Sequence, residues 1–217
     1  MLEVELKKIL LFIIPLFFIG CSGVPELINM DTAKKNVQSY YENGQYTLEM
    51  KTIIDEAIRK LSSRDLGKNP VAVFDIDETM LSNYPHTKEL GFGFNWKLWQ
   101  EWLFQADAPV IPQTKRLYDW LIANNVKIVF ITGRQYEVKD ATLKNLREQG
   151  ITEFEDLITR SPKTSKMSAI VFKNYERGVL ADKGYNVVVC VGDQWSDLEG
   201  DNIGLPVKLP NYLYIID

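Results

Sequence analysis

Short apolar runs alternate along this chain with stretches whose apolar residues recur at helical spacing. The runs cover residues 71–75, 127–133, 157–159, 186–191 and 207–209. Each has the length of a strand, and a continuous apolar run is typical of a strand buried on both faces of a parallel sheet. The pattern therefore predicts five parallel strands.

The stretches between these runs predict helices. Two of them, at 31–41 and 47–61, precede the first strand, and Gly67 and Pro70 stop the second. The apolar face of that second helix is formed by Leu48, Ile53, Ile54, Ala57, Ile58 and Leu61. Pro112 is expected to be the first residue of a further helix, a position at which proline is favoured. A later helix, which Gly150 closes, has a stripe formed by Val138, Thr142 and Leu146.

Strands that alternate with helices predict an α/β fold with an open, doubly wound, Rossmann-like parallel sheet. Ligands of such sheets bind beyond the carboxyl ends of the strands. Polar residues gather at three of those ends, namely Asp75 and Asp77, Thr132 and Gly133, and Asp193 and Asp197. We therefore expect acids and a hydroxyl from distant parts of the chain to face one crevice.

Composition narrows the class of protein without changing this fold. The chain has 217 residues, 46% of them hydrophobic, which suits a single globular domain. The net charge of −4 and the lack of a basic run give no electrostatic reason to bind a nucleic acid polymer. The lone histidine, His86, has no histidine or cysteine partner and is expected in a loop or cap. Cys190 lies in an apolar run and is expected to be buried.

The first twenty residues are expected to be a targeting segment. Lys7 and Lys8 precede an apolar run, 9–19, which is too short for the roughly 20 residues that span a bilayer. The run has the length of a signal-peptide core. It ends Phe-Ile-Gly-Cys at Cys21, which resembles the lipobox of bacterial lipoproteins and implies a lipid on that cysteine. A plain cleaved signal or an uncleaved anchor is the alternative. Residues 21–45 would then form a tether and a short helix.

The central motif is Asp-Ile-Asp-Glu-Thr, from Asp75 to Thr79. Two carboxylates at positions i and i+2 after a strand can turn toward one site. One can attack phosphorus and form an acyl phosphate, while Asp77 can protonate the leaving oxygen and later take a proton from water. An Asp-x-Asp pair alone is a weak signal, because paired acids are common on solvated loops.

Two further motifs strengthen this signal. Residues 71–79 resemble motif I of the haloacid dehalogenase superfamily, and 130–134 resemble its motif II, in which a strand ends in a phosphate-binding Thr or Ser. Residues 191–197 resemble motif IV, Gly-Asp-x-x-x-Asp. The sequence Gly-Asp-Gln-Trp-Ser-Asp at 192–197 and the segment 208–212 resemble the plant acid phosphatases and storage proteins of subfamily IIIB. The lipobox and motif I resemble the bacterial class C acid phosphatases of the same subfamily.

The resemblance implies a role for each motif residue. Asp75 would be the nucleophile and a magnesium ligand, and Asp77 the general acid and base, its backbone carbonyl also meeting the metal. Thr132 would hold a phosphate oxygen. Asp193 would bind Mg²⁺, with Asp197 binding directly or through water, since magnesium prefers oxygen ligands and retained waters.

Motif III is a single lysine, and Lys163, Lys166 and Lys173 are the candidates. Lys173 stands eleven residues before Gly184, the offset at which the family has its lysine. Its charge would neutralise the nucleophile and the transferring phosphoryl group. The alternative is an exposed lysine on a solvated helix face.

An insertion between motifs I and II, at about 80–111, is expected to form a small, mainly helical cap on a phosphatase domain of residues 46–217. It carries a dense group of aromatic rings, Phe92, Phe94, Trp96 and Trp99. Flat rings can stack on a base or an aryl group, although they also pack caps onto cores. Trp96, with Gly133 of motif II, is the expected substrate contact. Asn83 and Tyr84 are further candidates.

The sequence thus predicts a magnesium-dependent acid phosphatase that acts on small phosphomonoesters, with nucleoside monophosphates as one candidate substrate class. We expect a lipid to anchor it to a membrane of the cell envelope, outside the cytoplasm. A non-catalytic storage or ligand-capture protein and a phosphotransferase are the alternatives. Retention of Asp75, Asp77 and Asp193 favours the enzyme, because storage proteins of this subfamily can lose the nucleophile.

Overall fold

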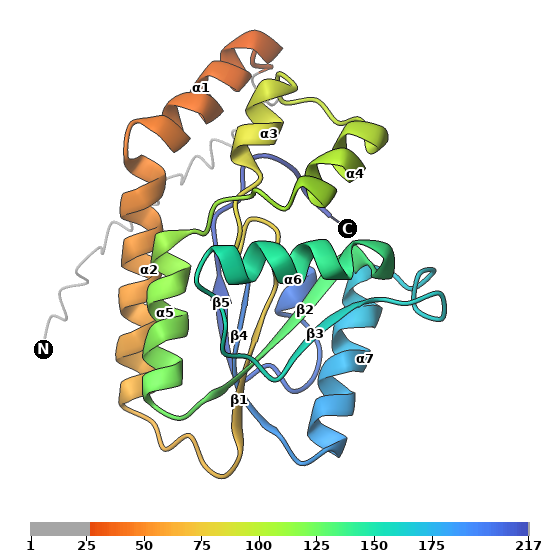
Figure 1. Ribbon diagram of the computed structural model, residues 1–217. Helices are drawn as coiled ribbons and strands as arrows, with labels where there is room; N and C mark the ends of the chain where they lie inside the picture. Colours follow the sequence, from red (N-terminus) through yellow and green to blue (C-terminus); the bar gives the residue numbers. More distant parts are fainter. Residues whose placement is uncertain (1–26, 217) are drawn as a thin grey trace, which may run out of the picture.

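The computed structural model describes residues 27–216 and contains a five-stranded parallel sheet (Figure 1). The strand order is β3-β2-β1-β4-β5. The strands are β1 Pro70–Phe74, β2 Lys127–Gln135, β3 Asp156–Arg160, β4 Asn186–Gly192 and β5 Leu205–Lys208. Each overlaps one of the five apolar runs, and the predicted doubly wound α/β fold is confirmed.

Helices cover both faces of this sheet (Figure 1). The helices beside the sheet are α2 Gln45–Ser62, α5 Pro112–Ala123, α6 Lys139–Glu148 and α7 Ala169–Asp182. Helices α2, α5 and α6 share one apolar cluster, and α7 packs in another on the opposite face. Above the sheet lie α1 Met30–Glu42, α3 Tyr84–Glu89 and α4 Trp96–Gln105, and short 3₁₀ turns occupy Tyr136–Val138 and Trp195–Asp197.

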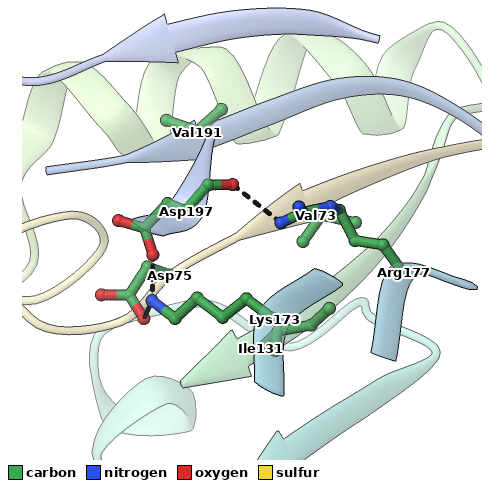
Figure 2. A pocket seen from close by; sticks show the side chains of 7 residues that line it. All are labelled: Val73, Asp75, Ile131, Lys173, Arg177, Val191 and Asp197. Atoms are coloured by element: carbon green, nitrogen blue, oxygen red, sulfur yellow. Dashed lines mark hydrogen bonds and ion pairs between the residues drawn. The ribbon is translucent and has the colours of Figure 1, made fainter. Parts of the chain in front are cut away.

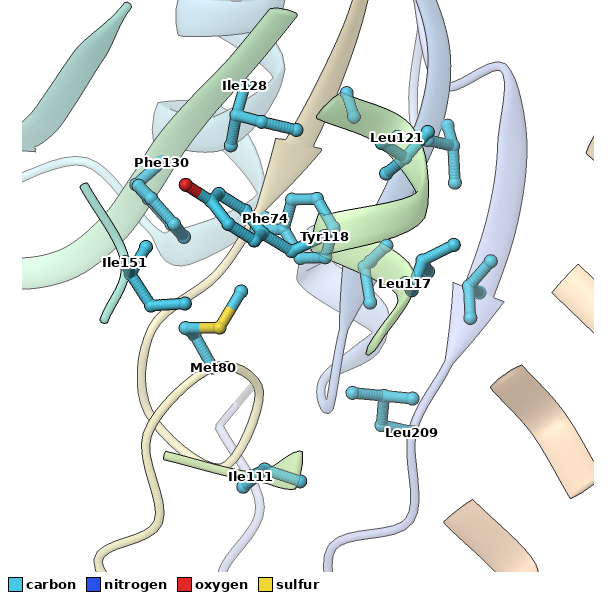
Figure 3. Packing of buried hydrophobic residues seen from close by; sticks show 14 of the residues in the cluster. Phe74, Met80, Ile111, Leu117, Tyr118, Leu121, Ile128, Phe130, Ile151 and Leu209 are labelled. Carbon is cyan, nitrogen blue, oxygen red and sulfur yellow. The ribbon is translucent and has the colours of Figure 1, made fainter. Parts of the chain in front are cut away.

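The central strand shows how an unbroken apolar run serves both faces. Ala72 and Phe74 of β1 belong to the cluster under α2 and α5, while Val71 and Val73 belong to the cluster under α7. Successive side chains of a strand point to opposite faces, so a strand covered on both sides needs apolar residues at every position. In the larger cluster, Phe74 lies next to other buried side chains from the sheet and α5 (Figure 3).

The strand order places a crevice at the end of β1. From β1 the chain passes to β2 and β3 on one side and later to β4 and β5 on the other. Ligands of open α/β sheets bind where the strand order reverses in this way. The polar residues at the carboxyl-terminal ends of β1, β2 and β4 meet at this point.

One predicted core residue lies outside the core. The buried residues of α2 are Met50, Ile54, Ala57 and Leu61, whereas Leu48 is 66% exposed. Two residues correspond to about 200° around an α-helix, so Leu48 and Met50 cannot share one narrow apolar face. The face of α2 that packs against the core is the one that contains Met50.

Helix α1 contacts the cap through tyrosines. Tyr41 stacks on Tyr84 of α3, with ring centroids 4.6 Å apart, and on Tyr46 of α2 at the same distance. Tyr84 also donates a hydrogen bond to Glu42, which pairs with Lys88 of the cap. These contacts join α1 to the cap, while the predicted domain boundaries stay a prediction.

The predicted targeting segment and Cys21 lie outside the described residues. Within residues 27–216, no helix combines the length and the apolar character needed to cross a membrane.

Candidate active site

Asp75 lies directly beyond β1 and remains part of the sheet ladder. Its backbone N–H donates to the carbonyl of Val191 in β4, at 3.0 Å. The side chain is buried and accepts a hydrogen bond from Lys173 of α7, at 2.9 Å. Lys173 also donates to Asp197 (Figure 2). One ammonium group thus joins two acids that are 122 positions apart in sequence.

Three carboxylates meet at this point. Asp75, Asp193 and Asp197 are buried, and each offers an oxygen within 4.8 Å of the others. Buried carboxylate oxygens at this spacing are a donor set that suits a hard divalent cation such as Mg²⁺. Among the described residues this is the one cluster of acidic, histidine or cysteine side chains with metal-binding spacing.

Hydrogen bonds fix Asp193 from three directions. One carboxylate oxygen accepts from Gln194 at 2.5 Å and from Asn211 at 2.7 Å, while the other accepts from Thr79 at 3.2 Å. Gly192, just before it, has no room for a side chain, because a Cβ atom there would collide with the carboxylate of Asp197. The Gly-Asp-x-x-x-Asp pattern therefore has a steric reason as well as a chemical one.

The electrostatics reflect this crowding. Burial raises the pKa of Asp75 well above its usual range, and although Lys173 opposes the rise, the neighbouring carboxylates reinforce it. Burial and the charge of Asp197 raise the pKa of Asp193 to about 6. Burial alone would lower the pKa of Lys173, but its two carboxylate partners outweigh that effect and raise it. The three carboxyl groups thus disfavour one another's ionisation, and Lys173 is the one cation in contact with them among the described residues.

Arg177 of α7 holds the loop that follows Asp193. Its guanidinium is completely buried and donates to the backbone carbonyls of Asp197, at 3.0 Å, and of Asp201, at 3.1 Å, as well as to that of Glu199. Arg177 therefore fixes the backbone on which Asp197 stands. Arg177 was not among the site residues predicted from the sequence.

Asp77 is held apart from the three clustered acids. The guanidinium of Arg134 binds its carboxylate with contacts of 2.7 to 3.1 Å, and the Asn83 amide donates to it at 2.8 Å. Trp102 of the cap donates in turn to the side-chain oxygen of Asn83, at 2.8 Å. Asn83, expected as a substrate contact, is instead fully buried and orients Asp77. Tyr84 points to α1 and does not line the cleft.

Glu78 occupies a strained position beside these acids. Its φ of 51° lies in the left-handed region, which costs a non-glycine residue energy. The carboxyl is buried and accepts from the backbone N–H of Asn83 at 2.5 Å. Burial is the main cause that raises its pKa to about 8. Glu78 closes the turn that carries Asp77 toward the crevice.

The motif II residues divide between core and cleft. Thr132 is completely buried, and its hydroxyl accepts from the backbone N–H of Arg134 at 3.2 Å. Gly133 lines the open cleft. The structure thus brings Thr132 beside the crevice without exposing it there.

A cleft of about 530 Å³ opens above Asp75 and Asp77. One wall is the cap, whose lining side chains include all four of the predicted rings, Phe92, Phe94, Trp96 and Trp99. Phe94 and Trp96 are 73% and 59% exposed, so these two are not buried packing residues. These rings and the two acids Asp75 and Asp77 therefore line the same cleft.

Another part of the lining comes from residues close to the C-terminus, which were not predicted from the sequence. Residues 213–216 line the cleft. They are held by Gln194, whose side-chain oxygen accepts from the backbone N–H of Ile216 at 3.1 Å. Asn211, which donates a hydrogen bond to Asp193, lies just before this segment and accepts from the backbone N–H of Leu213 at 2.8 Å. The isoleucines near the end gave no signal, because an apolar terminus looks the same in a core and in a pocket wall.

His86 and two of the three candidate lysines, Lys163 and Lys166, do not contact the clustered acids. His86 stacks on Trp102 in the cap, with ring centroids 5.3 Å apart, and burial lowers its pKa. It belongs to no metal-binding cluster of the described residues. Lys163 and Lys166 are exposed on the turn before α7. Of the three lysine candidates, Lys173 alone reaches the acids.

Comparison with known proteins gives one family. The chain matches the family described as HAD superfamily, subfamily IIIB (Acid phosphatase) over residues 24–217. It is 34% identical to vegetative storage protein 1 of Arabidopsis thaliana, over 88% of this chain and 74% of that protein. It is 31% identical to acid phosphatase 1 of Solanum lycopersicum, over 83% of this chain and 73% of that protein.

A solved structure shows the same fold. The class C acid phosphatase of Bacillus anthracis superposes with a TM-score of 0.71 at 24% identity, over 85% of this chain and 86% of that one. The family match over residues 24–217 confirms the predicted resemblance to subfamily IIIB.

Proposed function

Because the chain belongs to subfamily IIIB of the HAD superfamily, the acid phosphatases, we propose that it hydrolyses small phosphomonoesters through an aspartyl-phosphate intermediate on Asp75, with Mg²⁺ as cofactor. Family membership makes the chain a phosphomonoesterase. The metal, the intermediate and the substrate class are the parts of the proposal that go further.

One observation carries the proposal. Lys173 contacts both Asp75 and Asp197, and Asp193 completes a cluster within 4.8 Å. A nucleophilic carboxylate, a cation beside it and further oxygen ligands are what phosphoryl transfer to an aspartate needs in one place. The positions come from β1, α7 and the end of β4, so a chance gathering of surface acids does not account for them.

The side chains define a balanced reaction. A carboxylate oxygen of Asp75 attacks phosphorus and the ester P–O bond breaks, while Asp77 gives a proton to the departing alcohol oxygen. Asp77 then takes a proton from water, which attacks the phosphoryl group on Asp75 and releases inorganic phosphate. Arg134 and Asn83 hold the Asp77 carboxylate in place for both transfers.

Asp75, Asp193 and Asp197 would hold the magnesium ion, with the backbone carbonyl of Asp77. The ion would supply charge neutralisation and orientation of the phosphoryl group. Gln194 and Asn211 orient Asp193, and Arg177 fixes the backbone of Asp197. Thr132, next to Gly133, would offer its hydroxyl to a phosphate oxygen.

Two alternatives share this scaffold. A storage role without catalysis would not require the contacts of Lys173 and Arg134 with the acids, and it leaves these contacts without a purpose. Phosphotransfer to an alcohol would pass through the same intermediate and differs only in the acceptor. The test is phosphate release by the purified protein with Mg²⁺ from nucleoside monophosphates and aryl phosphates. Release of no phosphate from any of them would refute the proposal.

The rings that line the cleft give a prediction about selectivity. We expect Trp96→Ala to lower kcat/KM for adenosine monophosphate by about 5- to 150-fold, because stacking on one base is worth roughly 1–3 kcal/mol. Glycerol phosphate has nothing to stack and should lose much less. Phe104→Ala is the matched control, since Phe104 is an exposed ring of the same helix, α4, that does not line the cleft. Equal losses for both substrates would mean that Trp96 only packs the cap.

We further propose that a lipid on Cys21 anchors the protein in the cell envelope, outside the cytoplasm. The support is the Phe-Ile-Gly-Cys sequence after an apolar run too short to span a bilayer. Mass spectrometry of membrane-extracted protein should find an acylated N-terminal cysteine. Cys21→Ser should release the protein or block its processing, whereas Cys190→Ser, at a buried thiol, should leave the anchor intact. An unmodified Cys21 in the mature protein would contradict this proposal.

A further inference from the structure

Arg160 is a cation of the cleft wall that the reaction described above does not use. It is the last residue of β3, it lines the same cleft as Asp75 and Asp77, and it is 9% exposed. Its guanidinium lies over the ring of Phe172, 4.9 Å from the ring centre. The side chain is therefore built into the wall.

The hydrogen bonds of Arg160 use only one end of its guanidinium. Nη1 donates to the backbone carbonyls of Thr164, at 3.0 Å, and Met167, at 2.7 Å. Among the described residues, Nε and Nη2 have no acceptor, yet neither is sealed in the interior. Two donors of a planar fork therefore remain for a partner in the cleft.

The charges of the cleft single out the same residue. Arg134 is paired with Asp77, and Lys173 with Asp75 and Asp197. No carboxylate of the described residues lies within 4.0 Å of Arg160. A largely buried cation without a counter-ion is costly, and a bound anion would remove that cost.

The position of Arg160 suits the leaving group rather than the phosphoryl group. In the sheet order β3 is two strands from β1, which is roughly 10 Å across the sheet at the usual strand spacing. Leu157 is level with Phe74 in the register, so Arg160 also lies three residues beyond the end of β1 along the strand direction. Arg160 pairs in register with Gln135, which also lines the cleft. An anion on Arg160 would therefore belong to the far side of a substrate whose phosphate reaches Asp75.

We propose that Arg160 binds a second anionic group on the substrate, so that the cleft prefers phosphomonoesters whose alcohol carries a carboxylate or a further phosphate. Planar carboxylates and phosphates are the partners that a guanidinium fork binds best. The inference deepens the proposed function, on which it rests, by naming the substrate class of the same site.

The experiment compares 4-carboxyphenyl phosphate, its methyl ester and 1,4-phenylene bisphosphate as substrates. For Arg160→Gln, we expect the kcat/KM ratio of acid to methyl ester to fall about 10- to 100-fold relative to the wild type, the scale of a charge-assisted hydrogen bond. The effect of the ring substituent on the leaving group cancels in this ratio of ratios. The kcat/KM ratio of the bisphosphate to the methyl ester is measured in the same way. A fall in that ratio, with no fall in the ratio of acid to methyl ester, would identify phosphate as the group that is bound.

Lys166→Gln is the matched control, because it removes one positive charge from the exposed turn next to Arg160. It should leave the ratio unchanged, and Arg160→Lys should retain only part of it. If folded Arg160→Gln leaves the kcat/KM ratios of both the acid and the bisphosphate to the methyl ester unchanged, the proposal is overturned. The phosphatase function would then still stand.

Calorimetry with the wild type covers the remaining cases. If Arg160→Gln does not fold, or if no ester is turned over, 4-carboxybenzylphosphonate and its methyl ester provide the same comparison without chemistry. We expect the acid to bind the wild type, in the presence of Mg²⁺, at least about tenfold more tightly than the ester. Equal affinities would refute the role of Arg160. Absence of turnover with a clear preference for the acid would refute the proposed function alone.

Discussion

Asp75→Asn should lower kcat for any phosphomonoester by roughly 10⁴-fold or more, the scale of loss when an enzyme is deprived of its nucleophile. The amide is not a nucleophile toward phosphorus and is a poorer ligand for a cation. It retains the size of the carboxylate and a carbonyl oxygen that can accept from Lys173. The measurement is steady-state phosphate release by purified wild type and variant at equal concentration and saturating Mg²⁺.

The fold should survive this change. Asp75 is one of three acids within 4.8 Å of one another, and removal of one charge relieves their mutual repulsion. The thermal midpoint of Asp75→Asn should therefore be no lower than that of the wild type. Asp182→Asn, at an exposed position of α7, is the matched control and should retain full activity. Wild-type turnover by a folded Asp75→Asn protein would exclude the aspartyl-phosphate route.

Removal of divalent metal with EDTA should lower activity by about 10³-fold or more, and Mg²⁺ should restore it. Two unit charges 4 Å apart interact with about 4 kcal/mol at an effective dielectric constant of 20. Asp75, Asp193 and Asp197 with Lys173 leave an excess of negative charge facing a phosphate dianion. A divalent cation cancels that repulsion.

Binding of the metal can be measured apart from activity. Trp195 lies between Asp193 and Asp197 in sequence and is 62% exposed, so its fluorescence should report Mg²⁺ titration into the demetallated protein. Asp193→Asn should weaken that titration, and EDTA already saturated with Mg²⁺ should have no effect on turnover. Full activity in protein shown to be free of metal would contradict the proposed cofactor.

Most of the fold could be predicted because a strand that is buried on both faces is a continuous apolar run in the sequence. Residues 71–74 are apolar at every position, and the structure requires this because α-helices cover both faces of β1. The places of Asp75, Asp193 and Asp197 at the ends of two predicted strands likewise predicted that they meet in one crevice. The choice of Lys173 required the resemblance, since Lys163 and Lys166 have the same chemistry and only the fold separates them.

Contacts between distant segments could not be predicted. Arg177 binds backbone carbonyls, which every residue has, so no pattern marks its targets. Asn83 looked like a substrate contact because it follows motif I, but its depth depends on Trp102, which arrives from the cap. Leu48 was misplaced for a simpler reason: a helix has several apolar seams, and the sheet selects one of them.

Because Arg177 donates hydrogen bonds to backbone carbonyls of the loop after Asp197, these contacts determine which substitutions the loop tolerates. Glu199, Asp201 and Asn202 are exposed, and Arg177 contacts only the main chain of the first two. Gly200 is one exception, with a φ of 98° and no room for a Cβ beside Asn174, and Asn202 is another, because its φ of 53° lies in the left-handed region. A library randomised at 199 and 201 should therefore return many active clones, whereas one that includes 200 should return glycine there. Side chains of this loop can therefore change while the backbone position that Asp197 needs is preserved.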